Sequence, residues 1–306
     1  MRIGIDLGGT KIAGIVLRGE SEVCAMRRVA TPAGDYAGTL EALVKMVGAL
    51  EQTVGRTRLP VGIGHPGSLS PATGLLRNAN STCLNGRPFK QDLEARLGRE
   101  VRLANDADCL AASEACDGAG AGARSVFAAI LGTGVGGGLV VDGHLVQGAS
   151  GIAGEWGHNP LPWPRAEWGE IPGPLCWHGL HGCLETWLSG VGLAADHARA
   201  TGQPLGAEAI AARAAQGEAS AAATLERYYD RLARALAGVI NLLDPEVIVL
   251  GGGVSRIAAL YREVPRRWGS WIFSDVVNTK LVPARFGDAS GVRGAARLWP
   301  LEGKEP

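Results

Sequence analysis

The stretch RIGIDLGGTKIAGIVL, residues 2–17, joins two apolar runs through a Gly-Gly turn. Two apolar runs separated by a short glycine-rich turn are typical of a pair of strands in a hairpin. The stretch SVFAAILGTGVGGGLVV, residues 125–141, repeats this design. This weak internal duplication predicts two lobes of similar plan, each presenting one glycine turn to a shared cleft.

Helices and further strands are expected between and after these hairpins. Residues 39–55 carry leucine and valine at helical spacing, and residues 100–115 predict a strand, an Asn-Asp cap and a helix. A long helix is predicted at about 221–243, followed by a strand and a third glycine turn within PEVIVLGGGVS, residues 245–255. The closing segment SGVRGAARLWP, residues 290–300, predicts a short helix. This order predicts an α/β protein with mixed sheets.

The region 144–175 is rich in Gly, Pro and Trp and predicts a loop. A loop of this length within a compact protein is usually functional. We therefore expect part of the functional site to lie in or beside it.

Length and charge limit the classes of function. The 306 residues exceed a typical single domain, which favours two lobes. The chain has 30 Lys and Arg against 30 Asp and Glu, so net charge gives no support for a nucleic-acid or membrane-surface partner. The first residues resemble no signal peptide, and no run is long enough to span a bilayer. We expect a cytoplasmic protein.

Cysteine use follows from that compartment. Disulfides are rare in reducing compartments, so isolated cysteines are expected to be buried small residues and clustered ones to be metal ligands. The first four cysteines are scattered and only the last two cluster; the six are Cys24, Cys83, Cys109, Cys116, Cys176 and Cys183. A Cys176–Cys183 disulfide is therefore disfavoured.

The glycine turns predict a phosphate-binding site. GTGVGGG, residues 132–138, matches G-x-G-x-x-G, but a strand follows where a dinucleotide-binding fold needs a helix. Glycine backbone N–H groups can instead form a nest for phosphate oxygens. The turn DLGGTK adds the Thr10 hydroxyl and the Lys11 cation, and Asp6 could reach a phosphate-bound Mg²⁺. One such turn alone is better explained as a simple hairpin, but three together favour a nucleotide.

Several motifs occur in the order found in the ROK family of sugar kinases and repressors. They are GIDLGGTK, NANSTCLNG, VRLANDAD, GTGVGGG, GEWGHNPLPW, the cysteine cluster, VIVLGGG and SGVRGAARLWP, and they cover the chain from end to end. The sequence resembles most closely the family's bacterial fructokinases, also called mannofructokinases. Order and distance make this resemblance specific, unlike any single glycine pattern.

The resemblance implies an actin/hexokinase-like (ribonuclease H-like) α/β fold with two lobes around a central cleft. The small lobe is expected at residues 1–115 with 290–306, and the large lobe, with a zinc loop, at 116–289. ATP and Mg²⁺ are expected in the cleft. The residues implied to bind ATP are Asp6, Gly8, Gly9, Thr10, Lys11, Gly132, Thr133, Gly134, Gly136, Gly251, Gly252 and Gly253.

One aspartate is expected to take the proton of the sugar hydroxyl. Strand 101–104 delivers Asn105 and Asp106 to a helix start, where the helix dipole favours an ionised carboxylate. The residues alone would favour an N-cap role for Asn105 or Asp106. The resemblance places the catalytic base at Asp106, whereas Asp108 is expected to be structural.

Sugar recognition requires fixed donors and acceptors around a ring of hydroxyls. The resemblance implies sugar contacts at Asn105, Glu155, His158 and Glu185, and a close backbone approach at Pro66 and Gly67. Asn80 is added from its amide chemistry. His65 is expected to be a packing histidine.

The segment CWHGLHGC, residues 176–183, predicts a zinc site. Structural zinc takes four ligands, commonly Cys and His. Cys176, His178 and Cys183 offer three, and His158 is the candidate for the fourth, as the resemblance also implies. The family pattern is C-x-C-G-x-x-G-C, so His178 stands where a cysteine is usual. His181 as the ligand, or a weakened or empty site, is the alternative.

The expected function is transfer of phosphate from ATP to a hexose, most specifically to the 6-hydroxyl of fructose. Mannose, glucose or N-acetylglucosamine are alternative substrates. A sugar-responsive repressor is disfavoured, because family repressors carry a helix-turn-helix and the kinase-like region begins here at residue 2. A homodimer is implied by the resemblance alone.

Overall fold

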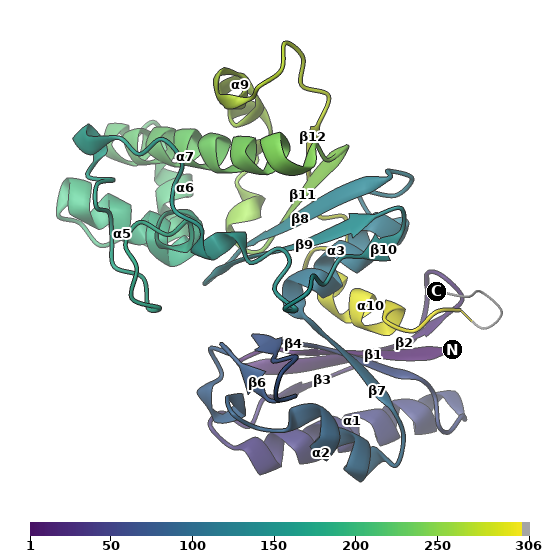
Figure 1. Cartoon of the computed structure of the whole chain (residues 1–306). Helices are drawn as coiled ribbons and strands as arrows, with labels where there is room; N and C mark the ends of the chain where they lie inside the picture. Colours follow the sequence, from purple (N-terminus) through teal and green to yellow (C-terminus); the bar gives the residue numbers. More distant parts are fainter. Residues whose placement is uncertain (302–306) are drawn as a thin grey trace. The chain divides into compact units, whose positions relative to one another are not determined.

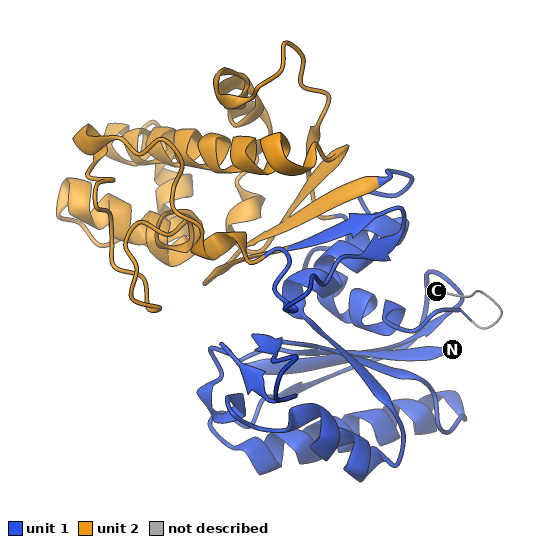
Figure 2. Ribbon diagram, viewed as in Figure 1, with its two compact units in different colours: residues 1–124, 138–154, 285–306 blue, residues 125–137, 155–284 orange. Residues whose placement is uncertain are grey.

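The computed structural model describes residues 1–301 and divides into two compact units. Unit 1 comprises residues 1–124, 138–154 and 285–306, and unit 2 comprises 125–137 and 155–284 (Figure 2). The units differ from the expected lobes mainly because residues 138–154 belong to unit 1. Residues 302–306 of the expected small lobe lie outside the described part.

Unit 1 is built on a five-stranded sheet with the order β3-β2-β1-β4-β7. β1 and β2 are antiparallel, which confirms the predicted hairpin at 2–17, and β3 is antiparallel to β2. On the other side β4 is parallel to β1, and β7 is parallel to β4. The strands are β1 (Arg2–Leu7), β2 (Lys11–Arg18), β3 (Glu22–Ala30), β4 (Val61–His65) and β7 (Val101–Asn105), with a small separate pair β5 (Ser68–Leu69) and β6 (Leu76–Arg77).

Helices cover both faces of this sheet (Figure 1). One face packs against α1 (Tyr36–Val54), whose buried Leu40, Leu43, Val47 and Leu50 form the predicted stripe, with α2 (Phe89–Leu97) beside it. The Asp35 side chain caps α1 by accepting from the Gly38 N–H at 3.0 Å. The other face packs against α3 (Asp106–Asp117) and α10 (Ser290–Arg297).

Glycines allow α10 to lie directly on the sheet. A Cβ on Gly4 of β1 would stand 2.1 Å from the Val292 carbonyl oxygen, and one on Gly62 of β4 would stand 1.8 Å from that of Ala295. Van der Waals contact needs well over 3 Å, so no larger residue fits at either position. The predicted closing helix is therefore confirmed, and its backbone forms part of the core of unit 1.

The second sheet repeats the order of the first. It runs β10-β9-β8-β11-β12, with β8, β11 and β12 parallel and β9 and β10 antiparallel. This equivalence explains the duplication between residues 2–17 and 125–141. The strands are β8 (Ser125–Leu131), β9 (Val135–Val141), β10 (His144–Leu145), β11 (Val247–Gly251) and β12 (Lys280–Pro283).

The core of unit 2 is formed by helices and by the part of the second sheet that belongs to this unit, mainly β8, β11 and β12. Leu225, Tyr229, Leu232 and Leu236 on the long helix are buried as predicted, but Leu243 at its end is 42% exposed, since the helix projects beyond the core there. The helices are α4 (Glu185–Leu188), α5 (Gly190–Thr201), α6 (Ala207–Ala215), α7 (Ala219–Leu243), α8 (Leu260–Glu263) and α9 (Pro265–Trp268).

The exposure of the cysteines and the lengths of the apolar helices test two further expectations. All six cysteines are free, but of the scattered four only Cys109 is buried, and Cys116 is exposed beside Arg297. The prediction of buried cysteines is confirmed for Cys109 but not for Cys24 and Cys83, which are half-buried, and it is wrong for Cys116, because α3 turns that residue outward near its end. Among residues 1–301, no helix combines the length and the apolar character needed to cross a membrane.

Candidate functional site

The predicted base lies at the junction of β7 and α3 in unit 1. Asn105 caps the helix, because its Oδ1 accepts from the backbone N–H groups of Ala107 at 2.7 Å and Asp108 at 3.1 Å. Asp106 is the first helical residue and is exposed, with Oδ1 2.8 Å from the Ala107 nitrogen. Asn105 thus supplies the cap, and Asp106 lies exposed at the positive end of the helix dipole.

Asp6, at the end of β1, lies near this helix start. Burial, and after it the charge of Asp106, raise the pKa of Asp6 to about 6, while Lys11 acts in the opposite direction. Gly291, in the first turn of α10, lies against the Asp6 carboxylate. A divalent cation bound near these two carboxylates would offset the repulsion between them. The donor set therefore fits a Mg²⁺ ion.

The turn between β1 and β2 is open. Thr31 holds it in place, donating from Oγ1 to the Gly8 carbonyl at 2.7 Å and from its backbone N–H to the Thr10 carbonyl at 3.0 Å. The nearest atom to a Cβ on Gly9 would be the Ser81 Oγ at 3.8 Å. The Lys11 ammonium lies 3.8 Å from Asp288, and both side chains are exposed. A ligand could thus approach this backbone closely.

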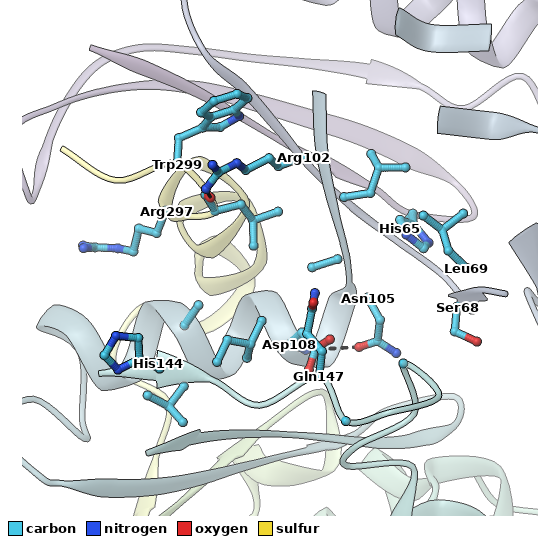
Figure 3. Close-up of a pocket in the computed structure, with 18 of the residues that line it drawn as sticks. His65, Ser68, Leu69, Arg102, Asn105, Asp108, His144, Gln147, Arg297 and Trp299 are labelled. Atoms are coloured by element: carbon cyan, nitrogen blue, oxygen red, sulfur yellow. Dashed lines mark hydrogen bonds between the residues drawn. The ribbon is translucent and has the colours of Figure 1, made fainter. Parts of the chain in front are cut away.

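A cavity of about 1240 Å³ in unit 1 includes Asn105 and His65 in its lining (Figure 3). His65 is buried, and burial lowers its pKa. Its Nδ1 lies 3.0 Å from the Pro66 carbonyl oxygen, which can only accept, so Nδ1 carries the hydrogen. Gly67 has φ of 74° and packs against β6, where a Cβ would stand 2.3 Å from the Arg77 carbonyl oxygen. His65 is thus a packing histidine that fixes the Pro66–Gly67 turn.

Asn80 lies elsewhere in unit 1. It lines a smaller cavity of about 410 Å³ together with Gly9 and Thr10 of the open turn, and it does not line the cavity that holds Asn105. Asn85 fixes this segment through two hydrogen bonds of 2.9 Å, to the N–H and the carbonyl of Ala79. The structure therefore groups Asn80 with the residues predicted to bind phosphate.

Unit 2 brings its own two glycine turns together. Gly252 has φ of 84°, and a Cβ on it would stand 2.5 Å from the Leu131 carbonyl oxygen and 3.0 Å from the Gly132 nitrogen. The contact follows from the parallel pairing of β8 with β11, which ends both strands at the same edge. The Gly190 N–H, at the start of α5, donates to the Gly132 carbonyl at 2.7 Å. The predicted turns 132–136 and 251–253 thus form one surface.

Three predicted sugar-contact residues are positioned by β9. The indole N–H of Trp156 donates to the Gly136 carbonyl at 2.8 Å, and Gly157 packs so closely on Val135 that no Cβ would fit. This anchors the short helical turn Trp156–His158 and its preceding residue, Glu155. The Val135 N–H donates to Glu185 Oε2 at 3.0 Å. The strand therefore connects Glu155, His158 and Glu185.

The predicted metal ligands also meet in unit 2. One ligand atom from each of His158, Cys176, His178 and Cys183 lies within 4.8 Å of the others. Cys176 Sγ is 3.7 Å from His158 Nδ1, and Cys183 Sγ is 3.8 Å from His178 Nε2. Tetrahedral zinc bonds imply ligand separations of about 3.3–3.8 Å, which these two pairs match, while the limit of 4.8 Å for the four atoms is wider. The donor set therefore fits zinc in residue type. The imidazole of His181 instead contacts the Gly173 carbonyl, at 2.9 Å from Nδ1.

Without a cation the Cys183 thiol holds its proton more tightly than a free cysteine does. Burial, then nearby Cys176, raise the pKa of Cys183 to about 11. Metal binding releases the protons of such cysteines, so the affinity of the site for zinc should rise with pH.

A buried ionic network orders the segment that leads to this cluster. Glu170 Oε1 accepts from Arg231 at 2.7 Å and Arg234 at 2.9 Å, and Oε2 accepts from the Arg165 N–H at 2.7 Å. Burial acts to raise the pKa of Glu170, but these donors outweigh it and lower that pKa. Arg234 also donates to the Trp163 carbonyl at 2.8 Å. The predicted loop 144–175 is thus largely irregular, yet firmly attached to α7.

Sequence reasoning missed Glu170, Asn85 and Trp177 as positioning residues. Trp177 donates its indole N–H to Glu185 Oε1 at 3.1 Å. The only available signals were a charged residue in an otherwise apolar loop, a second Asn after NANS, and a large aromatic residue between two ligands. None of these identifies its partner.

The two mixed sheets with helices on their faces define a hexokinase-like α/β protein. The ROK hexokinase from Thermus thermophilus has the same fold, with a TM-score of 0.86, 31% identity and 98% of each chain covered. A ROK family glucokinase from Streptomyces griseus, solved with glucose and AMPPNP, gives a TM-score of 0.79 at 29% identity, covering 97% of this chain and 98% of the other.

The family model described as ROK family matches residues 2–302, so this chain belongs to the ROK family. A curated relative, the N-acetyl-D-glucosamine kinase of Photobacterium profundum, is 42% identical over 302 residues, covering 97% of this chain and 99% of the relative. These findings confirm the expected family and fold. They give no support to a particular relationship with fructokinases.

Proposed function

We propose that the protein is an ATP-dependent kinase of hexoses with Asp106 as the general base. The observation that carries this proposal is the exposed Asp106 carboxylate at the start of α3, capped by Asn105 and close enough to Asp6 to raise its pKa. Phosphoryl transfer depends on positioning and charge stabilisation, with one group to accept the hydroxyl proton. The names of the relatives, hexokinase, glucokinase and N-acetyl-D-glucosamine kinase, support the same reaction class.

In the proposed reaction a sugar hydroxyl oxygen forms a bond to the γ-phosphorus as the bond to ADP breaks, and the hydroxyl proton passes to Asp106. The turns at 8–11, 132–136 and 251–253 would hold phosphates and adenosine with their backbone N–H groups. Asp6 would bind Mg²⁺ directly or through water. The ion would supply charge neutralisation of the phosphates.

The sugar would be held by Asn105, Glu155, His158 and Glu185, with the Pro66–Gly67 backbone beside it. The resemblance favoured fructose, but the curated relatives at 40–42% identity are named N-acetyl-D-glucosamine kinases. We therefore take N-acetylglucosamine as the first candidate substrate and fructose as the second. A homodimer stays a prediction from the resemblance.

The test is a coupled assay of ADP release with N-acetylglucosamine, fructose, mannose and glucose, using wild type, Asp106→Asn and Asp108→Asn. We expect Asp106→Asn to lose at least about 100-fold in kcat while still binding sugar in calorimetry, because only the proton acceptor is removed. Asp108→Asn is the matched control and should stay within a few-fold of wild type. Substantial turnover by Asp106→Asn would refute the base assignment, and no turnover with any hexose would refute the function.

We also propose that the four-residue cluster binds structural zinc. Elemental analysis of protein purified without a histidine tag should give about one zinc per chain. His178→Ala should lose the metal, whereas His181→Ala should keep it, because His181 contacts the Gly173 carbonyl. Loss of zinc in His181→Ala but not in His178→Ala would reverse the ligand assignment.

A further inference from the structure

Trp177 is an exposed aromatic residue held in a fixed position. Its side chain is 65% exposed, although it lies between the buried Cys176 and the cluster member His178. Its indole N–H donates to Glu185 Oε1 at 3.1 Å. Its ring meets the His158 imidazole edge to face, with 5.3 Å between ring centroids. One side chain thus contacts two of the proposed sugar-binding residues.

Glu185 is held from two sides. Oε1 accepts from Trp177, and Oε2 accepts from the Val135 N–H at 3.0 Å. A carboxylate offers about four acceptor positions, so these two donors leave others for the hydroxyls of a ligand. Two donors on different oxygens also fix the plane of the carboxylate, which a single donor would not do.

The Trp177 ring is fixed by these contacts while most of its surface stays exposed. A planar apolar ring beside fixed hydrogen-bonding groups suits a sugar, which presents both a C–H face and hydroxyls. The groups beside Trp177 are the imidazoles of His158 and His178 and the carboxylate of Glu185. The ring and these polar groups would therefore contact different faces of the same ligand.

We propose that Trp177 is a positioning and specificity-determining residue for the sugar. Its N–H fixes the carboxylate of Glu185, and its exposed ring packs against the C–H face of the bound hexose. This inference rests on the proposed kinase function and deepens it. It predicts that the identity of residue 177 governs the affinity for sugar and the preference among hexoses, whereas the affinity for ATP is independent of it.

The test compares Trp177→Phe, which keeps a ring but loses the N–H, with Trp177→Ala, which loses both. Losing a hydrogen bond to a charged group should raise the sugar KM of Trp177→Phe about tenfold. Trp177→Ala should show a larger rise and an altered order of kcat/KM among the four hexoses. In both variants the KM for ATP should stay within about twofold of wild type, because the Val135 N–H still holds Glu185 against the turn 132–136.

Trp163→Phe is the matched control. Trp163 lies in the loop 144–175, which precedes the cluster, and is 46% exposed, but its ring stacks on Trp271 at 5.0 Å. All its kinetic parameters should equal those of wild type. Zinc content should be equal in wild type and all variants, since Trp177 contributes no ligand atom.

Three outcomes would overturn the inference. The first is an unchanged sugar KM in Trp177→Phe. The second is a rise in the KM for ATP as large as the rise in the sugar KM. The third is loss of zinc in Trp177→Phe, which would show that the substitution disturbs the structure of the cluster. Calorimetric titration of the wild type with each sugar separates this failure from failure of the function. If the wild type binds and phosphorylates a hexose and Trp177→Phe has the same sugar KM, only the role of Trp177 is refuted. If the wild type binds no sugar, both the role of Trp177 and the proposed function are refuted.

Discussion

The turns at 8–11 and 132–136 have similar sequences but different surroundings. In unit 1 a Cβ on Gly9 would meet the Ser81 Oγ only at 3.8 Å, an ordinary contact. In unit 2 a Cβ on Gly134 would stand 2.6 Å from Glu185 Oε2, which is too close. Neither glycine has φ in the left-handed region, so space and not backbone conformation distinguishes them.

This difference separates two reasons for a glycine in a turn. At Gly9 the missing side chain leaves the backbone open to an outside ligand. At Gly134 it makes room for a carboxylate of the protein itself, which the neighbouring Val135 N–H then holds. Variants of the two turns should therefore affect different properties of the enzyme.

Gly134→Ala is expected to have the largest effect. The added methyl must displace the Glu185 carboxylate, and a misplacement of about 1 Å at a positioning group can reduce the rate about 100-fold. We expect kcat/KM for the sugar to fall by about that factor, measured in the coupled assay. Activity within a few-fold of wild type would show that Glu185 has no such role, and circular dichroism should confirm an intact fold.

Asp6→Asn tests the half-buried carboxylate beside the open turn. Because burial and Asp106 raise the pKa of Asp6 to about 6, the folded state holds its proton more tightly than the unfolded chain. The free energy of unfolding of the wild type should thus fall as the pH rises from about 4 to about 6. Above about pH 6 the loss of stability caused by ionisation of Asp6 should be complete. Asn carries no charge at any of these pH values, so the Asp6→Asn variant should not lose this stability.

We expect Asp6→Asn to be more stable than wild type by about 2–3 kcal/mol at pH 8 without Mg²⁺, and nearly equal to it at pH 4. Urea unfolding at the two pH values measures this difference. The exposed Asp288 is the last of the causes that raise the pKa of Asp6, so the control Asp288→Asn should reduce the pH dependence only slightly. If Asp6→Asn is no more stable than wild type at pH 8, ionisation of Asp6 does not destabilise the folded protein.

Gly9→Ala should have the smallest effect on stability and an informative one on binding. The methyl fits, so the free energy of unfolding should change by less than about 1 kcal/mol. If the turn contacts phosphate, the KM for ATP should rise while that for the sugar stays constant. Thermal unfolding and the two KM values test this, and an unchanged KM for ATP would exclude close phosphate contact at Gly9.

Much of the fold was predictable because its signals are local. The hairpin at 2–17, the leucine stripe of α1 and the strand–cap–helix at Asn105 follow from spacing and capping within a few residues. The exposure of Cys116 and of Leu243 was not predictable, because it depends on where an element extends beyond the packed core. A Cys and His donor set was also predictable, since these residue types at short spacing restrict the chemistry, and the four side chains do meet.

The sequence by itself determined the family, the glycine turns and the types of side chain at the site. Tertiary structure alone decided that His178 and not His181 joins the cluster, that Asn80 lies with Gly9, and that Trp177 reaches Glu185. The physical reason is distance along the chain: propensity and capping act over one or two turns, whereas the Val135–Glu185 contact joins residues 50 positions apart. Such contacts exist only once the sheets have brought their strand ends together.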